Sequence, residues 1–242
     1  MNVMTPQDRL IFALDVQGKK EAERYVRLLE GVVGCFKIGL ELFISEGPDI
    51  VKMIREQSDA NIFLDLKLHD IPATVKGALR SAEKLGVRYI TIHSTEGEEI
   101  LATAQEVKNS GLEVLAVTVL TSTSASSLAN LGIREDINTA ALVLDRAVRA
   151  QNSGCAGVVC SGEEAKVVKQ KCGTSFKIVV PGIRPEWASV SGDDQSRIAT
   201  PSQAIRDGAD MIVVGRPIRN AEDPREAAQK IIEEISIFDN SK

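Results

Sequence analysis

The chain has 242 residues, of which 43% are hydrophobic and 4% aromatic, with a formal net charge of −5 and a pI of about 5.3. This length is large for one ordinary domain but usual for a single α/β barrel, and the apolar content is enough to fill an aliphatic core. The acidic balance excludes broad binding to nucleic acid or to anionic membranes, which requires a basic surface, but it allows a local basic pocket for a small anion.

Eight short segments rich in Ile and Val predict the buried strands of a parallel sheet. They cover residues 10–16, 35–40, 61–68, 89–93, 114–120, 157–160, 177–183 and 211–216. Amphipathic patterns between them predict helices at 19–30, 41–57, 72–85, 96–109, 136–152, 162–171, 201–207 and 224–236. Eight β-then-α units predict an α/β fold, a (β/α)8 TIM barrel, as a single domain over residues 1–242. The alternative is a doubly wound open sheet, which usually has a GxGxxG turn after its first strand, and LDVQGKKEA lacks that turn.

Several residues mark where the predicted helices begin and end. Pro72 suits a first helical turn, and Thr200 is the predicted N-cap before Pro201. Gly86, Gly111 and Gly208 are predicted to close helices before the next strand, and Gly154 plays a similar part. The connections 121–132 and 184–197 are long, and long connections in a barrel are usually binding loops.

The cysteines and the N-terminus favour a soluble, cytoplasmic protein. Cys35, Cys155, Cys160 and Cys172 form no CxxC pair and match no zinc spacing, so we expect reduced thiols that fill the core. The first residues, MNVMTPQDRL, lack the apolar segment of a signal peptide, and no apolar run approaches the roughly 18 residues of a membrane helix.

Polar side chains, most of them ionisable, gather where the predicted strands end, which is where a (β/α)8 barrel places its active site. In chain order these positions hold Asp15, Lys37, Asp65, Lys67, Asp70, His93, Thr121, Arg184 and Arg216. Asp65 and Lys67 are two residues apart on one strand, so their side chains are expected on the same face. A buried charge is costly unless it is paired, and Lys37 and Asp70 can supply the partners.

Most of these polar residues could also have a purely structural role. Asp15 could cap the first helix, Lys37 could extend out of a strand end, and Asp70 could be the N-cap of the helix at Pro72. Asp65 and Lys67 could form a purely structural ion pair. His69 and His93 lack a third ligand, so a structural zinc site is not expected.

The last two strands predict a phosphate site, because barrels often bind phosphate through the connections after strands 7 and 8. These connections hold PGIR at 181–184 and VGR at 214–216. Glycine lets backbone N–H groups approach an oxyanion, and Arg184 or Arg216 can clamp it. Gln195 in the long connection could fold over the phosphate and complete the site.

With these residues in view, the chain resembles the orotidine 5′-phosphate decarboxylase family over nearly its whole length. The matching segments are ALDV, FKIGLELF, DLKLHDIPATV, VTVLTS, VVCSGEEA, PGIRP, DDQSR and VVGRPI. A DxKxxD core also occurs in related phosphate-binding barrels such as 3-hexulose-6-phosphate synthase and 3-keto-gulonate-6-phosphate decarboxylase. We therefore rest the resemblance on the whole set; Ala73 lies inside it at a place expected to vary.

The resemblance implies that the chain decarboxylates orotidine 5′-phosphate (OMP) to UMP and CO2, the last step of de novo UMP synthesis, with no cofactor and no metal. It implies that Lys67 is the catalytic proton donor and that Asp65 lies beside the substrate carboxylate. Asp15 and Lys37 would hold ribose hydroxyls and the charged network, and Thr121 would contact the pyrimidine. The phosphate side would consist of Pro181, Arg184, Gln195, Gly215 and Arg216. Asp70 and Thr74 would enter the site of the other subunit of a homodimer.

Three other functions remain as alternatives. The first is a Mg²⁺-dependent sugar-phosphate lyase or decarboxylase of the related barrels. The second is an aldolase in which Lys67 forms a Schiff base, although its carboxylate neighbours should keep it protonated. The third is a nucleotide-binding regulator on a catalytically dead barrel, which would not need the Asp65–Lys67 pair.

Overall fold

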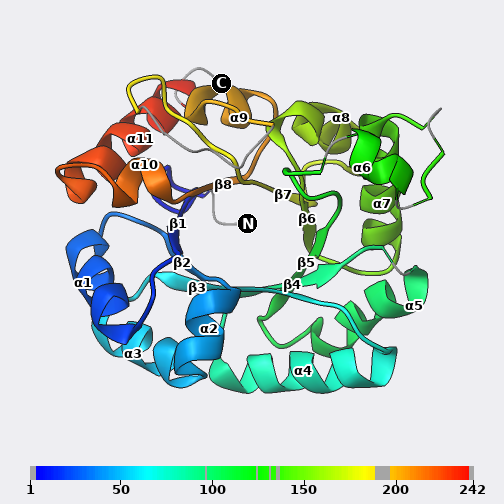
Figure 1. Cartoon of the computed structure of the whole chain (residues 1–242), viewed down its shortest axis with the longest axis horizontal. Helices are drawn as coiled ribbons and strands as arrows, with labels where there is room; N and C mark the ends of the chain where they lie inside the picture. The colour runs from blue at the N-terminus through cyan, green and yellow to red at the C-terminus, as the bar shows by residue number, and fades with distance from the viewer. Residues whose placement is uncertain are drawn as a thin grey trace.

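Eight parallel strands close into a barrel in sequence order, and β8 pairs with β1 (Figure 1). The structure is a computed structural model that describes residues 4–95, 97–123, 125–130, 132–134, 137–188 and 197–239. The strands are β1 (Leu10–Leu14), β2 (Cys35–Ile38), β3 (Asn61–Leu68), β4 (Tyr89–His93), β5 (Glu113–Val117), β6 (Gly157–Val159), β7 (Lys177–Val180) and β8 (Met211–Val214). The predicted (β/α)8 fold and the order of its strands are thus confirmed.

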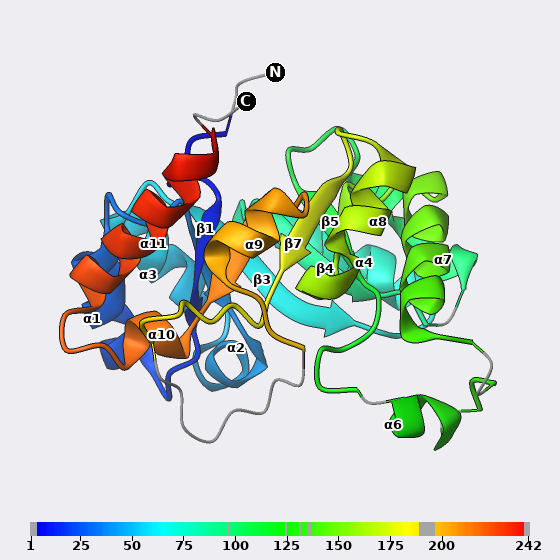
Figure 2. The ribbon, with the colours of Figure 1, turned by 90° about the horizontal axis from the view of Figure 1, so that it is seen from above.

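Helices surround the barrel on all sides (Figure 1). They are α1 (Lys19–Leu29), α2 (Leu40–Glu46), α3 (Asp49–Gln57), α4 (Pro72–Leu85), α5 (Glu98–Leu101), the 3-10 helix η1 (Ala102–Val107), α6 (Ala125–Asn130), α7 (Thr139–Asn152), α8 (Gly162–Cys172), α9 (Pro201–Arg206), α10 (Arg216–Arg219) and α11 (Pro224–Asp239). Figure 2 shows α2, α6 and α10 at one end of the barrel, opposite the two chain termini. Among the described helices, none combines the length and apolarity needed to cross a lipid bilayer.

Some predicted helices differ from those in the structure. The single helix predicted at 41–57 is wrong, because Gly47 adopts a left-handed φ of 62° and Pro48 follows it, so α2 ends and α3 begins there. Where a helix was predicted at 96–109, the described residues form only the one-turn α5 before the narrower η1. The short α6 and α10 were not predicted, because each has too few residues to show a helical period.

The helix caps in the structure exclude two of the structural interpretations, in which Asp15 and Asp70 are N-caps. The Thr200 side chain accepts a hydrogen bond from the Gln203 N–H, as predicted for an N-cap. The N-cap of α1 is Gly18 and that of α4 is Ile71, so Asp15 and Asp70 are not the N-caps of these helices. Both carboxylates are therefore available for other contacts.

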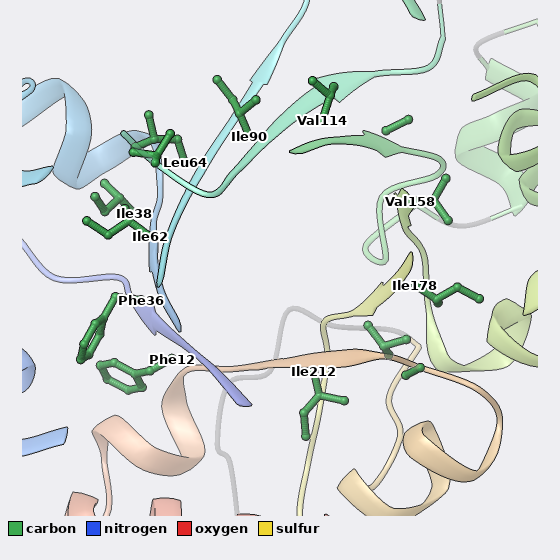
Figure 3. Close-up of a cluster of buried hydrophobic side chains, with 14 of the residues drawn as sticks. Phe12, Phe36, Ile38, Ile62, Leu64, Ile90, Val114, Val158, Ile178 and Ile212 are labelled. Atoms are coloured by element: carbon green, nitrogen blue, oxygen red, sulfur yellow. The ribbon is translucent and has the colours of Figure 1, made fainter. Parts of the chain in front are cut away.

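Alternation along the strands produces two separate cores. Side chains such as Phe12, Phe36 and Ile212 point outward and pack against the helices (Figure 3). The intervening positions face the barrel axis and form a second cluster of buried residues, namely Ile11, Ala13, Cys35, Phe63, Tyr89, Leu115, Val179, Met211 and Val213. This inner cluster closes the barrel below the carboxyl ends of the strands, so the next inward position on each strand lies at the barrel mouth.

The barrel wall has no room for a side chain at Gly157, where β6 pairs with β7. A Cβ added to Gly157 would lie 2.3 Å from the backbone oxygen of Lys177, its pairing partner. Gly157→Ala should therefore lower the free energy of unfolding by about 1–3 kcal/mol, measured by urea denaturation, because one strand must move.

The control for this change is Gly77→Ala in α4. A Cβ at Gly77 meets no heavy atom within 4 Å, so this variant should be more stable than wild type by about 0.5–1 kcal/mol. Equal stability of the two variants would show that β6 and β7 have room for the added methyl group.

Candidate active site

A cavity of about 620 Å³ opens at the carboxyl ends of the strands. The inward positions that follow the inner cluster supply its charged wall: Asp15 comes two residues after Ala13, just beyond β1, and Asp65 comes two residues after Phe63 on β3. The cavity therefore lies where the alternation of each strand continues beyond the apolar interior.

The structure brings most of the candidate residues together around this cavity. Its lining includes Asp15, Lys37, Asp65, Lys67, Thr121, Pro181, Arg184, Gly215 and Arg216. Asp70 and Thr74 are exposed beyond the end of β3 and are not among the described residues that line the cavity. Gln195 lies outside the described residues.

Charges of alternating sign run across one wall of the cavity. The Lys37 ammonium lies 3.0 Å from Asp15 Oδ1 and 3.8 Å from Asp65 Oδ2, while the Lys67 ammonium lies 2.9 Å from the same Asp65 oxygen. One carboxylate oxygen thus lies beside two ammonium groups. Asp70, by contrast, accepts a hydrogen bond from the backbone N–H of Ile71 at 2.7 Å.

The backbone at Lys67 departs from a regular strand. Its φ of 50° is the only positive value among the described non-glycine residues, and the pairing of β3 with β4 shifts register between Leu64 and Leu68. The Lys67 N–H consequently bonds to the Thr91 hydroxyl oxygen at 2.8 Å, and that hydroxyl donates to Asp65 Oδ1 at 3.0 Å. The Asp65 carboxylate therefore holds the Lys67 backbone N–H through the Thr91 hydroxyl, and it holds the Lys67 ammonium directly.

Thr91 was not predicted to be a site residue. It is fully buried in β4 at an inward position, two residues after Tyr89 of the inner cluster. The available signal was a hydroxyl within the apolar run YITIH, because a buried hydroxyl needs a hydrogen-bond partner.

The Asp65 carboxylate remains ionised despite its burial. Burial by itself would raise its pKa, but the adjacent Lys37 and Lys67 ammonium groups and the Lys67 and Thr91 hydrogen bonds outweigh that effect, so the pKa of Asp65 is lowered. The site therefore holds a fixed anion between two cations.

The opposite side of the cavity is formed after β7 and β8. Gly182 has a φ of 74°, a value that favours glycine, and the turn brings Arg184 to the cavity wall. The Arg184 guanidinium donates to the Ile183 carbonyl at 2.8 Å, and Arg216 begins the short α10. Two guanidinium groups beside glycine-containing turns are suited to bind a phosphate.

Two further cavity residues were not predicted. Arg219 lies three residues after Arg216 on α10, a spacing that places both side chains on one face, and it donates to the Asp15 carbonyl. Cys160 also lines the cavity, but burial raises the pKa of its thiol, so it is not an activated nucleophile.

The two histidines lie near each other, with ring centroids 5.6 Å apart for His69 and His93. Burial lowers the pKa of His93, and the charges of His69 and Lys67 act in the same direction. No group of three potential metal ligands occurs among the described residues. The imidazole of His93 is therefore harder to protonate than that of an exposed histidine.

The chain is similar to known proteins over most of its length. The model of the orotidine 5′-phosphate decarboxylase / HUMPS family matches residues 8–231. Orotidine 5′-phosphate decarboxylase of Desulfosudis oleivorans is 48% identical over 95% of this chain and 94% of that protein, and the Pelobacter propionicus enzyme of the same name is 43% identical over 97% and 98%. A crystal structure of orotidine 5′-phosphate decarboxylase from Lactobacillus acidophilus matches with a TM-score of 0.81 and 36% identity, covering 93% of this chain and 98% of that one.

The lowered pKa of Asp65 makes stability depend on pH in a defined direction. An ionised carboxylate with a depressed folded-state pKa stabilises the fold above its unfolded pKa of about 3.9, and this contribution is lost as the pH falls through the folded value. Asp65→Asn should therefore be less stable than wild type at pH 7, and the difference in free energy of unfolding should shrink below about pH 4.

Urea denaturation between pH 7 and pH 3 measures this difference, with Asp59→Asn at an exposed position as the matched control. A gap between Asp65→Asn and wild type that stays constant across this range would contradict the ionic role of Asp65.

Proposed function

Because the chain belongs to the orotidine 5′-phosphate decarboxylase / HUMPS family, we propose that it converts orotidine 5′-phosphate to UMP and CO2 with Lys67 as the proton donor. Relatives named for this reaction are 41–48% identical over most of the chain. The chain is accordingly a carboxy-lyase of pyrimidine biosynthesis. The observation that supports the role of Lys67 best is its ammonium group, held 2.9 Å from Asp65 at the wall of the cavity.

Electrostatics can supply the chemistry. When the bond between C6 and the carboxyl group breaks, the electron pair stays on a ring carbon that has no conjugated sink. An ammonium fixed beside C6 stabilises this charge and then transfers its proton to C6, which gives UMP. The Lys67 side chain is 31% exposed, so a bound nucleotide can reach it.

Asp65 would keep Lys67 charged and correctly placed. Desolvation in a closed site opposes an ammonium, and an adjacent carboxylate favours it. Like-charge contact between Asp65 and the substrate carboxylate would also raise the energy of the ground state, as a secondary effect. Lys37 and Asp15 would extend this network towards the ribose hydroxyls.

The remaining contacts would bind the ends of the nucleotide. Arg184, Gly215 and Arg216 would hold the phosphate, with Pro181 at the cavity wall and Gln195 folding over from the connection after β7. Thr121 would contact the pyrimidine. The phosphate is remote from the bond that breaks, so its binding energy can be used to order the site around the reacting carbon.

The alternatives differ in what they require. A Mg²⁺-dependent lyase needs a carboxylate-bound metal, whereas here Asp65 already lies within 4 Å of two ammonium groups. A Schiff base needs a neutral lysine, and Lys67 bonds to a carboxylate of lowered pKa. A mere nucleotide binder has no need of the Asp65–Lys67 ion pair at the cavity wall. We therefore propose a mechanism without cofactor or metal.

We also propose that the active unit is a homodimer, acting in the cytoplasm, in which Asp70 and Thr74 complete the neighbouring site. Both residues are exposed, and Ile71 beside Asp70 is 66% exposed although it is a large apolar residue. An apolar side chain next to a charged one on an exposed turn is suited to a subunit interface.

Replacing Lys67 tests the proposed function most simply. Lys67→Ala should lower kcat by about ten-thousand-fold or more, because both charge stabilisation and proton donation are lost, while UMP still binds. The loss of OMP absorbance measures turnover, and calorimetry measures UMP binding. Near-normal turnover of the variant would refute the role of Lys67.

The same assay with EDTA distinguishes the proposed metal-free reaction from the metal-dependent alternative. Wild-type turnover should be unchanged after chelation, and activity that disappears and returns with added Mg²⁺ would favour that alternative instead.

Thr91 should affect turnover through Lys67. Thr91→Val keeps the shape but removes the hydroxyl that fixes the Lys67 N–H and Asp65, so kcat/KM should fall by about a hundred-fold. Thr91→Ser keeps the hydroxyl and should retain most of the activity. If valine and serine variants have equal kcat/KM, the hydroxyl does not position Lys67.

Mixing inactive subunits tests the shared site. A heterodimer of Lys67→Ala and Asp70→Ala subunits contains one site with both residues intact, so random mixing should restore about one quarter of wild-type activity. A mixture of Asp70→Ala with the Lys67→Ala/Asp70→Ala double variant should restore nothing. No recovery despite confirmed subunit exchange would show that Asp70 does not act across the interface.

A further inference from the structure

Arg197 joins two connections that are far apart in the sequence. Its guanidinium pairs with the carboxylate of Glu164, at the start of α8. Its second terminal nitrogen donates to the carbonyls of Val119 at 3.4 Å and Leu120 at 3.1 Å, just after β5. The Arg197 side chain is only 10% exposed, so these contacts are largely shielded from water.

Glu164 is itself held in place, so it fixes the position of the Arg197 guanidinium. The residue is 2% exposed, and its other carboxylate oxygen accepts hydrogen bonds from the Ser161 N–H and hydroxyl. These bonds complete a capping box at the N-terminus of α8. Arg197 is therefore attached to a helix that packs on the barrel.

Both connections lead directly to the cavity. Val119, Leu120 and the following Thr121 line it. On the other side, the segment that follows Arg197 pairs with the segment before Arg184: Ile183 forms a parallel bridge with Ala199, and the Arg184 N–H donates to the Ala199 carbonyl at 2.8 Å. The guanidinium thus lies between the side of the cavity that carries Thr121 and the side that carries Arg184.

We propose that Arg197 is a positioning residue that holds these two sides of the nucleotide site in register. This inference rests on the proposed function, in which Thr121 contacts the pyrimidine and Arg184 the phosphate. Arginine suits the task, because its planar fork can donate to a carboxylate and to two carbonyls at once, which a lysine ammonium cannot do in the same geometry. A buried ion pair contributes little net stability compared with apolar side chains, so the main effect of this one is on geometry.

Arg197→Lys tests the proposal, because it keeps the positive charge beside Glu164 and removes the fork. We expect kcat/KM for OMP to fall at least about ten-fold at a temperature where the variant is fully folded. The matched control is Arg88→Lys at the opposite end of the barrel, where Arg88 likewise binds a carboxylate, Glu113, and a carbonyl, that of Gly111. Its kcat/KM should stay within about two-fold of wild type, because it is remote from the cavity.

A double-mutant cycle with Thr121→Ala gives a readout that general destabilisation does not change. If Arg197 acts by placing Thr121, removal of the Thr121 side chain should cost much less in the Arg197→Lys background than in wild type. The proposal is overturned if Arg197→Lys loses no more activity than Arg88→Lys, if Thr121→Ala alone has no effect, or if the two effects multiply.

A second variant covers the case in which Arg197→Lys is unfolded, and a wild-type measurement covers the case in which the proposed function is wrong. If circular dichroism shows that Arg197→Lys does not fold, the double variant Arg197→Met/Glu164→Gln removes both buried charges and should show the same loss and the same non-additivity. Wild-type turnover of OMP in this assay tests the proposed function separately from the role of Arg197.

Discussion

One carboxylate oxygen of Asp65 lies beside the ammonium groups of both Lys37 and Lys67, and the rest of the site depends on this contact. Without the two cations, a carboxylate buried at the barrel mouth would carry a desolvation cost too large to remain ionised. Without the carboxylate, two ammonium groups would repel each other across the same small space. The arrangement is stable only as a set, which is why the charges alternate in sign from Asp15 to Lys67.

Most of the apolar packing that stabilises the fold lies below this charged set. The outer core packs strands against helices, and the inner cluster fills the barrel axis up to the cavity, where Ala13, Phe63 and Val213 form part of its apolar lining. The site can therefore tolerate a left-handed Lys67 and a register shift between β3 and β4, since the surrounding wall fixes them. Thr91 links the two parts, because it belongs to the inner face of β4 and bonds to both Lys67 and Asp65.

Sequence alone predicted the barrel and most of the cavity wall, because both follow from local patterns. The ends of the predicted strands mark Asp15, Lys37 and Asp65, and Gly–Arg turns after the last two strands mark the opposite side. The break at Gly47 and the roles of Thr91 and Arg197 were missed, although Gly47–Pro48 is a turn signal and Thr91 is a hydroxyl within an apolar run. A helical period does not reveal a local left-handed residue, and contacts between distant segments depend on register and packing. The individual chemical roles came from the family resemblance rather than from spacing.

The most direct measurement of the role of Lys67 is the exchange of the C6 proton of UMP in D2O, followed by NMR. By microscopic reversibility, the group that protonates C6 must also remove that proton. Wild-type protein should therefore introduce deuterium at C6 of UMP, and Lys67→Ala should not, although it still binds UMP. Undiminished exchange by Lys67→Ala would mean that another group carries the proton, and the charged wall around Asp65 would then have a different purpose.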